Sequence, residues 1–307
     1  MWVVHPHLQT NKMARKIICK SEKDWHKKRG LGIGGSDAAA LLGLHPYCTA
    51  YELWESKIGI TPHQKENNFM KMGKMLEPIV VKLFGQNTGF QIENKKGFDE
   101  IYIHDKFPFA RCTPDRTYIT FEKQRELLSV KSHFAYNKID VDDFPEYWFC
   151  QLQWEMGITG IHSGKIAWLE RGIDFRYKHF DFVPEFFESM LSAADVFWNE
   201  NVIEKNEPDP TVNDNLQRIF NKSFAGKTID ASNELFLLIG QYSIFRNLRM
   251  ENREAEENSL QEIKLIMRGA EAVTYDGQPI CTWTGGTQRR FALKKGIFKT
   301  HSGDNDE

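Results

Sequence analysis

Two short motifs in the middle of the sequence carry residues suited to phosphate chemistry. Pro114-Asp115 is followed, after thirteen residues, by Ser129-Val130-Lys131. In a strand, Ser129 and Lys131 would point to the same face, and Asp115 on a neighbouring strand could meet them. A carboxylate beside a lysine would let oxygen-ligated Mg²⁺ bind a phosphate while the lysine orients a water. The pattern indicates phosphodiester hydrolysis, although Pro-Asp turns and exposed strand lysines are common by themselves.

The segments before these motifs have helical character. Four helices are expected, over residues 21–29, 37–44, 49–59 and 67–86. Ser36 is expected to cap the second helix, after the glycine-rich turn GLGIGGSD. Pro78 would kink the fourth helix or begin its second half, and it places Glu77 at an irregular point.

In the middle of the chain, the spacing of apolar residues changes from a helical pattern to a strand pattern. Between residues 91 and 132, short β-branched or aromatic runs alternate with turn residues, which is typical of strands. Helical spacing returns at 144–160, strand candidates follow at 164–170 and 174–182, and an amphipathic helix is expected at 183–200. This order predicts an α/β fold in which helices flank a central mixed sheet.

Composition shifts suggest the organisation of the chain. We expect an N-terminal arm (1–20), a core (21–204), a linker (205–231), a helical segment with a β-hairpin (232–300) and a disordered tail (301–307). Residues 232–269 could form one long helix or a helical hairpin. Asp276-Gly277 is the sequence of a tight hairpin turn.

The composition sets broad limits on function. A net charge of −2 argues against a generally basic, histone-like binder but permits local basic patches. The five cysteines lack zinc-binding spacing and indicate reduced thiols in an intracellular protein. No apolar run reaches the roughly 20 residues of a membrane span, and the N-terminus lacks a signal-peptide pattern. We therefore expect a soluble, cytoplasmic protein.

Several sequence blocks occur in a distinctive order. They are WHKKRGLGIGGSDAAALLGLHPYCTAYELWESKIG, GKMLEP, CTPD, SVK and CQLQWEMGITG. In this order they resemble the YqaJ-type viral recombinase family, in the lambda-exonuclease-like branch of the PD-(D/E)xK nucleases, over roughly residues 20–200. The resemblance implies a restriction-endonuclease-like core, with a central mixed β-sheet flanked by helices, and a C-terminal helical arm with a β-hairpin.

The resemblance also implies roles for matching positions in the site. Asp115 would be the principal metal ligand and Lys131 the catalytic lysine. Glu77 matches a helix-borne acid that assists the metal or the water, and Gln151 matches a glutamine that accompanies the site. Val130 would offer its backbone carbonyl to the metal. The alternatives are a solvated glutamate for Glu77 and a polar helix face for Gln151.

A second group of residues resembles the part of the family site that holds a DNA end. Arg29 and Ser36 match residues that bind the terminal phosphate. A guanidinium grips phosphate oxygens in pairs, and a glycine-rich turn at a helix start presents N–H donors. Lys28 would add charge, and Thr113 matches a small hydroxyl residue beside the site. Alternatively, Ser36 only caps its helix and Lys28 and Arg29 are solvated surface.

The sequence departs from the family pattern at Ser129, where an acid is expected as a metal ligand and catalytic group. A hydroxyl is a poor substitute for a charged oxygen around a hard cation. Glu126 lies three residues earlier, which places it on the opposite face of a strand unless a bulge intervenes. The serine could be an inactivating substitution, a tolerated feature of a natural nuclease, or the mark of a natural non-catalytic relative.

Taken together, the resemblance implies a Mg²⁺-dependent DNA nuclease in which Mn²⁺ could substitute. Its expected activity is exonucleolytic resection of double-stranded DNA ends for phage or prophage recombination, in the cytoplasm of a bacterial host. The alternative is a DNA-binding relative that does not cleave. The expected partners are duplex DNA ends, a single-strand annealing protein and further copies of the chain in a ring, such as a trimer.

Overall fold

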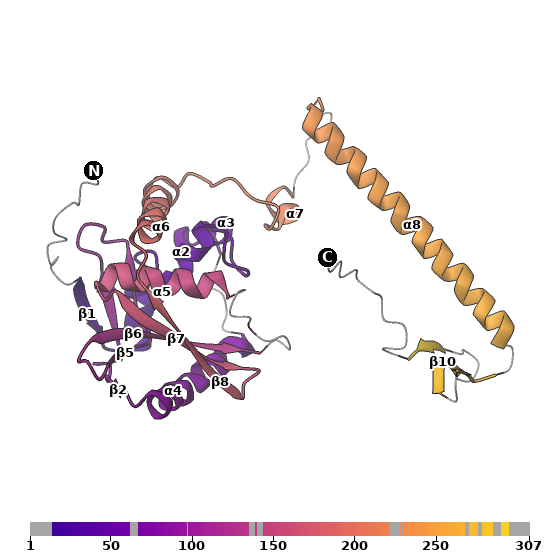
Figure 1. Cartoon of the computed structure of the whole chain (residues 1–307). Helices are drawn as coiled ribbons and strands as arrows, with labels where there is room; N and C mark the ends of the chain where they lie inside the picture. The colour runs from indigo at the N-terminus through magenta and orange to yellow at the C-terminus, as the bar shows by residue number, and fades with distance from the viewer. Residues whose placement is uncertain are drawn as a thin grey trace, which may run out of the picture. The chain divides into compact units, whose positions relative to one another are not determined.

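The chain divides into two compact units, Met1–Lys222 and Ser223–Glu307 (Figure 1). The computed structural model describes residues 14–61, 67–96, 98–134, 139, 144–221, 228, 230–267, 270–275, 278–284 and 290–294. The first thirteen residues of the expected arm, the Asp276-Gly277 turn and the expected tail at 301–307 lie outside the described residues.

A five-stranded mixed sheet forms the centre of the first unit (Figure 1). In spatial order its strands are β2 (Gln91–Ile92), β5 (Arg116–Ile119), β6 (Arg125–His133), β7 (Ser163–Glu170) and β8 (Asp174–Asp181). Strands β6 and β7 are parallel, whereas the other neighbours are antiparallel. Because a parallel pair needs a long crossover, α5 (Glu146–Thr159) connects β6 to β7. The predicted α/β fold with a central mixed sheet is confirmed.

Helices cover both faces of this sheet. On one face, α4 (Asn68–Thr88) packs Val80 and Phe84 against Leu128 and its neighbours. On the other face, α5 packs Leu152 against Leu127. Side chains alternate along a strand, so Ser129 and Lys131 of β6 share the α5 side with Leu127.

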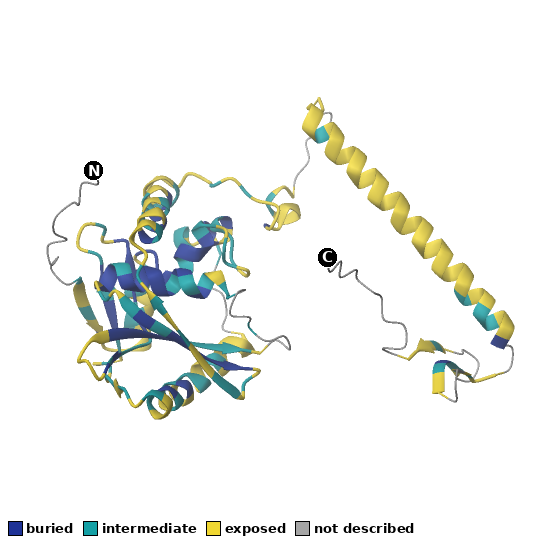
Figure 2. Cartoon of the chain, in the orientation of Figure 1, coloured by how far each residue is buried: buried dark blue, intermediate teal, exposed yellow. Residues whose placement is uncertain are grey.

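Three short helices precede the sheet in the chain: α1 (Glu22–Arg29), α2 (Gly35–Leu41) and α3 (Ala50–Ile58). The side chains of α2 that meet α5 are small and apolar. Figure 2 shows buried residues concentrated in both helices. The prediction that Ser36 caps α2 is wrong, because the cap is Gly34. The Asp37 carboxylate accepts a hydrogen bond of 2.9 Å from the Gly34 N–H, which starts the helix before Ser36.

A smaller antiparallel sheet lies in the same unit. Its strands, in order, are β1 (Arg15–Cys19), β3 (Asp99–Ile103) and β4 (Arg111–Cys112). Residues 15–19 therefore form a strand, whereas the sequence predicted a loose arm over 1–20. The physical reason is that Cys19 is buried against Ile101 and Ile103, which anchors the segment.

The end of the first unit contains α6 (Pro184–Val196), the π-helical turn η1 (Phe197–Ile203) and α7 (Leu216–Ile219). Part of the expected linker at 205–231 is held against α3. Arg218 forms two hydrogen bonds, of 2.6 and 2.8 Å, with the buried Glu55 carboxylate. The Tyr51 hydroxyl donates to Glu207 at 2.5 Å. The proline-rich and asparagine-rich composition therefore marks irregular backbone here, not a free connection.

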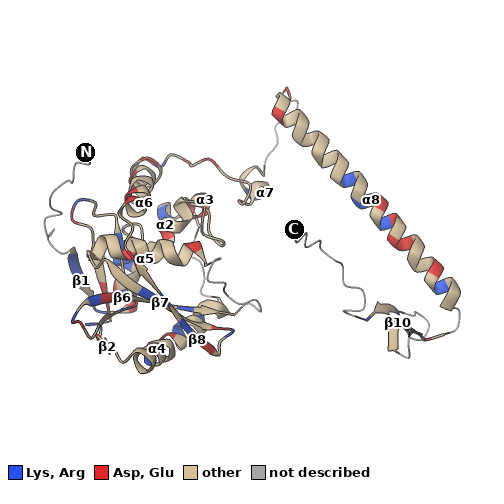
Figure 3. Ribbon diagram, viewed as in Figure 1, with Lys and Arg blue, Asp and Glu red and all other residues tan. Residues whose placement is uncertain are grey.

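The second unit contains one long helix and a small sheet. Helix α8 (Asn233–Met267) is continuous, which resolves the choice between one helix and a helical hairpin. It is exposed along nearly its whole length, and its charged residues gather in its second half (Figures 2 and 3). Strands β9 (Ala272–Tyr275), β10 (Gln278–Thr284) and β11 (Arg290–Leu293) form an antiparallel sheet in the order β11-β10-β9. Among the described residues, no helix is long and apolar enough to cross a membrane.

Candidate active site

A pocket of about 580 Å³ in the first unit brings together residues that are far apart in the sequence, from Glu22 to Glu155. Its wall contains six of the residues predicted from the sequence: Arg29, Ser36, Glu77, Thr113, Asp115 and Gln151. Lys131 reaches this wall through a hydrogen bond to Gln151. Lys28 is not part of the wall, because its ammonium group binds Asp24 on α1 at 2.8 Å.

Asp115, immediately before β5, is fixed by a hydrogen bond to the neighbouring strand β6. Its Oδ2 atom accepts a hydrogen bond of 2.7 Å from the Val130 N–H. This bond holds the carboxylate beside the Ser129–Lys131 segment, as the strand pattern predicted. The antiparallel pairing of β5 with β6 keeps the two segments in register. Asp115 therefore has one oxygen committed to the backbone and its position defined by the sheet.

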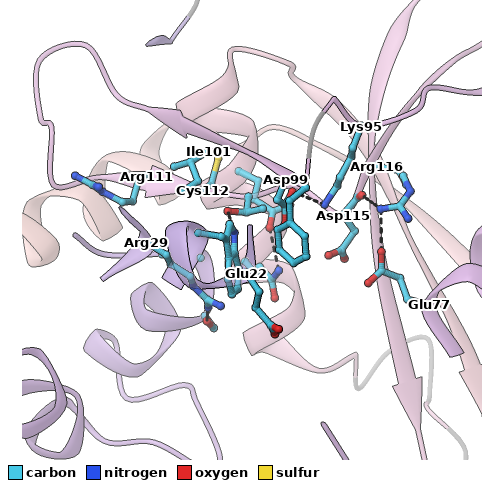
Figure 4. Close-up of a pocket in the computed structure, with 18 of the residues that line it drawn as sticks. Glu22, Arg29, Glu77, Lys95, Asp99, Ile101, Arg111, Cys112, Asp115 and Arg116 are labelled. Carbon is cyan, nitrogen blue, oxygen red and sulfur yellow. Dashed lines mark hydrogen bonds and ion pairs between the residues drawn. The ribbon is translucent and has the colours of Figure 1, made fainter. Parts of the chain in front are cut away.

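Glu77 lies next to Asp115 in the pocket, on the turn of α4 that precedes Pro78 (Figure 4). Its Oε1 atom forms an ion pair of 2.9 Å with Arg116. Burial and the neighbouring Asp115 carboxylate raise the pKa of Glu77 above its ordinary value, although Arg116 opposes the shift. A second positive charge at this place would favour the ionised forms of both acids.

A chain of hydrogen bonds links β6 to α5 at the pocket wall. The Lys131 ammonium donates to Gln151 Oε1 at 2.8 Å, and Gln151 Nε2 donates to Glu155 Oε1 at 2.9 Å. Glu155 is buried and also belongs to the wall. Burial, followed by the repulsion of Asp115, raises the pKa of Glu155 to about 8. The lysine is thus held in place by an amide whose other end contacts an acid.

Glu155 is a residue of the pocket that no motif in the sequence indicated. One signal was present, since residues four apart on a helix lie on the same side and Glu155 follows Gln151 by four. The signal was weak because α5 is buried on several sides and carries many apolar residues. Ser129, in contrast, was predicted correctly to share a face with Lys131, but its side chain is fully buried.

The other end of the pocket is built from α1 and α2. The Arg29 guanidinium lies over the Trp25 ring at 4.9 Å and donates to the Ser36 hydroxyl at 3.2 Å. Thr113 joins this end by accepting a hydrogen bond of 3.2 Å from the Trp25 indole N–H. The alternative in which Ser36 is only a helix cap is excluded by the Gly34 cap.

A partly buried ion pair supports this end of the pocket. The Lys57 ammonium donates to the Gly32 carbonyl and to the Asp37 carboxylate, both at 2.7 Å. Burial opposes ionisation of Asp37, but Lys57 and Arg29 outweigh it and lower the pKa of Asp37 below its ordinary value. Asp37 in turn accepts from the Gly34 N–H. The glycine-rich turn is therefore tied to α3 as well as to α2.

Gly35 joins the two ends of the pocket. A Cβ atom at this residue would lie 2.8 Å from Gln151 Cγ and 3.2 Å from the Gln151 carbonyl oxygen. Only glycine permits α2 to approach α5 this closely, because any side chain would collide with the backbone and side chain of Gln151.

The donor set fits a hard divalent cation in part. Carboxylates and carbonyls are the groups that Mg²⁺ accepts, and Mg²⁺ commonly uses one or two protein carboxylates with waters and substrate phosphates. Within the described part of the chain, no three His, Cys, Asp or Glu residues are gathered closely enough to hold an ion by themselves. The buried oxygens Ser129 Oγ and Glu155 Oε2 have no hydrogen-bond partner among these residues. Unsatisfied oxygens beside two other acids are consistent with a cation site that substrate and water complete.

The fold and the pocket define a mixed α/β domain with an acidic pocket and a lysine on its central sheet. Residues 24–162 match the YqaJ-like viral recombinase domain. The chain is also 28% identical to the uncharacterized protein YqaJ of Bacillus subtilis (strain 168), over 298 residues that cover 93% of this chain and 91% of that protein.

Two solved structures show weaker similarity. An alkaline exonuclease (LHK-Exo) from Laribacter hongkongensis is 15% identical, with a TM-score of 0.48, and the match covers 59% of this chain and 93% of that one. A phage related exonuclease from Haemophilus somnus 129PT is 12% identical, with a TM-score of 0.43, and the match covers 57% and 96%.

Proposed function

We propose that this chain is a metal-dependent deoxyribonuclease that shortens double-stranded DNA from its ends during phage or prophage recombination. The observation that carries the proposal is that one pocket contains both acids suited to a metal ion and an arginine suited to a phosphate. Glu77 and Asp115 lie at one end with the Lys131–Gln151 pair, and Arg29 lies at the other end. The YqaJ-like viral recombinase domain supports the role in recombination.

The chemistry divides between these residues. Mg²⁺, or Mn²⁺ in its place, would supply a positive charge that polarises the scissile phosphate and activates water. Asp115 and Glu77 would hold the cation, together with the carbonyl of Val130. Lys131, oriented by Gln151, positions the attacking water, whereas Ser129 offers only a neutral hydroxyl.

Arg29 supports an exonuclease over an endonuclease. Its guanidinium carries two N–H edges suited to phosphate oxygens and is already aligned by Trp25 and Ser36. A terminal phosphate exposes more oxygens and more charge than a phosphodiester within the strand. A DNA end held there would place an internal bond of the same strand near the acids.

Degradation of linear and circular DNA tests this proposal. Linear duplex labelled at one end and covalently closed circular duplex are incubated with the protein and Mg²⁺, and a parallel reaction contains EDTA. We expect loss of the linear duplex from its ends, survival of the circle and no reaction in EDTA. Equal cleavage of the circle would replace exonuclease with endonuclease, and degradation in EDTA would contradict metal dependence.

A DNA-binding protein that does not cleave is the second candidate. The observation in its favour is Ser129, a fully buried hydroxyl where the family resemblance leads us to expect an acid. Comparison of the parent with Ser129→Glu separates the candidates. If neither protein degrades linear duplex while both bind it, the chain is a binding protein. If only Ser129→Glu cleaves, the serine disables the nuclease.

The family resemblance also leads us to propose assembly partners. The chain would form a homo-oligomeric ring around duplex DNA, such as a trimer, and would pass single strands to an annealing protein. Size-exclusion chromatography with light scattering measures the number of copies. A monomer at micromolar concentration, with or without duplex DNA, would contradict the ring.

A further inference from the structure

Ser129 faces a defined part of α5. On β6 it lies between Leu127, which packs against α5, and Lys131, which donates to Gln151 of α5. The three side chains share one face of the strand because they alternate with Leu128 and Val130. Ser129 is fully buried, and its Oγ atom has no hydrogen-bond partner among the residues that the structure describes.

Glu155 lies on the same side of α5 as Gln151, one helical turn later. Its side chain is almost completely buried, with 2% of the residue exposed, yet it lines the pocket with Asp115. Oε1 accepts from Gln151, whereas Oε2 has no partner within the described ranges. A buried carboxylate oxygen without a partner is costly. A positive ligand in the pocket would remove this cost.

Glu126, the other acid close to Ser129 in the sequence, already has hydrogen-bond partners. Glu126 lies on β6 but belongs to the opposite face, where it accepts hydrogen bonds from the Tyr118 hydroxyl and, at 3.0 Å, from Lys165. Tyr118 packs with Val80 and Phe84 of α4. No bulge interrupts the pairing of β6 with β5 or β7, so Glu126 cannot take the place of an acid at residue 129.

We propose that Glu155 supplies the acid that Ser129 lacks, and that it binds a divalent cation together with Asp115. The carboxylate comes from helix α5 instead of strand β6 but enters the same pocket. The small side chain of Ser129 leaves this part of the sheet face to Glu155. The role of the cation in DNA cleavage rests on the proposed function, but binding of the cation by Glu155 can be measured without DNA.

The proposal makes residues 129 and 155 alternatives to one another. Each position can carry the acid, but acids at both positions would bury two like charges beside Asp115. An acid restored on the strand should therefore compensate for its removal from the helix. Glu155→Gln is a suitable first variant, because the amide has the same shape and can still accept from Gln151.

The test is a calorimetric titration of metal-free protein with Mn²⁺ in the absence of DNA. The proteins are the parent, Glu155→Gln and the double variant Ser129→Glu/Glu155→Gln. We expect Glu155→Gln to bind Mn²⁺ about tenfold or more weakly, in line with losses at metal sites. The double variant should regain affinity to within about threefold of the parent. Thermal unfolding of each protein verifies that it is folded.

Glu126→Gln is the matched control, since it removes a buried carboxylate three residues from Ser129 on the other face. Its Mn²⁺ affinity should equal that of the parent, although its loss of the Lys165 ion pair should lower its stability. A tenfold loss of affinity in this control would indicate that Glu126, on the opposite face of β6, contributes to the metal site. This result would overturn the proposal.

Other outcomes also decide the matter. If Glu155→Gln binds Mn²⁺ as tightly as the parent, or if the parent shows no saturable binding at millimolar Mn²⁺, the proposal is overturned. In the first case Glu155 serves only to position Gln151. If the parent binds Mn²⁺ through Glu155 but degrades no linear duplex, the proposed nuclease function fails while this metal ligand stands.

Discussion

The two ends of the pocket differ in how completely their polar groups are paired. At the Arg29 end, Lys57, Asp37 and the glycine-rich turn satisfy one another through short hydrogen bonds. At the acidic end, buried oxygens of Ser129 and Glu155 have no partner in the described part of the chain. Buried polar groups are normally paired, and exceptions are found at functional sites. Apart from the Arg111 Nε donor, the Arg29 end is therefore paired before a ligand arrives, and we call it the complete end. The acidic end, with its unpaired oxygens, is the incomplete end that a cation would complete.

The largest effect is expected from Asp115→Asn at the incomplete end. The amide oxygen can still accept from the Val130 N–H, so the fold should persist. Loss of the charge should lower the rate of DNA degradation by about 10³-fold, the scale of a lost electrostatic contribution in a site of this kind. End-labelled linear duplex measures the rate, and fluorescence anisotropy measures binding. An Asp115→Asn variant that cleaves normally would remove Asp115 from the mechanism.

At the complete end, Lys57→Met should cause a large loss of stability. The variant leaves the Asp37 carboxylate, which is 18% exposed, without its ammonium partner, although Arg29 stays nearby. Breaking a fully buried pair costs about 3–5 kcal/mol, so we expect a loss of about 2–3 kcal/mol for this partly buried pair. Urea denaturation measures the free energy of unfolding. The double variant Lys57→Met/Asp37→Asn is the control, and it should recover part of the loss. Equal stability of Lys57→Met and the parent would show that the pair does not support this end.

The same pair predicts the direction of a pH effect. Lys57 and Arg29 hold the pKa of Asp37 below its ordinary 3.8. The contribution of the ionised carboxylate to stability is therefore fully present above that ordinary value and is lost as the pH falls through the lower pKa of the folded state. Compared with the parent, Asp37→Asn should be less stable at pH 7, and the difference should shrink in acid. Thermal unfolding between pH 2.5 and 7 measures it.

Metal ions should affect only the incomplete end. Mn²⁺ at about 100 times its dissociation constant should stabilise the parent by about 2.7 kcal/mol, because it binds the folded state. The gain should be absent in Asp115→Asn and retained in Lys57→Met. Differential scanning calorimetry with and without EDTA measures it. An equal gain in all three proteins would place the ion elsewhere.

The smallest effect is expected from Arg29→Lys. The lysine keeps the charge but loses the planar pair of N–H groups and the stacking on Trp25. The preference for duplex with a terminal phosphate over dephosphorylated duplex should fall several-fold, or about 1 kcal/mol. Lys28→Met is the neighbouring control, since Lys28 binds Asp24 and does not line the pocket. The same loss in both variants would indicate general charge and not a terminal-phosphate site.

Sequence reasoning succeeded where a local rule determines geometry. The two-residue period of a strand placed Ser129 with Lys131 and separated Glu126 from both, and the structure has this arrangement. Helical periodicity located α3, α4 and α5 to within a few residues. The family blocks also indicated which distant segments meet, because Glu77 and Asp115 line one pocket.

It was less successful where the outcome depends on packing between segments. The Lys57–Asp37 pair joins α2 to α3 and follows from no local pattern. Strand β1 forms because Cys19 is buried against Ile101 and Ile103 of β3. The sequence of residues 15–19 alone does not indicate this contact. Glu155 appeared as one polar residue in an apolar helix, and its unpaired oxygen is evident only when α5 lies on β6.

The close contact at Gly35 has a consequence for how a substrate is measured. Because the Gln151 backbone and side chain leave no space for even a methyl group at residue 35, α2 packs directly on α5 with no side chain between the two backbones there. This contact therefore helps to keep the distance between Arg29 and the acids constant. Under the proposed function, a DNA strand whose end is bound by Arg29 would present its scissile bond to the acids at a distance that the α2–α5 contact determines, whatever the sequence of its bases.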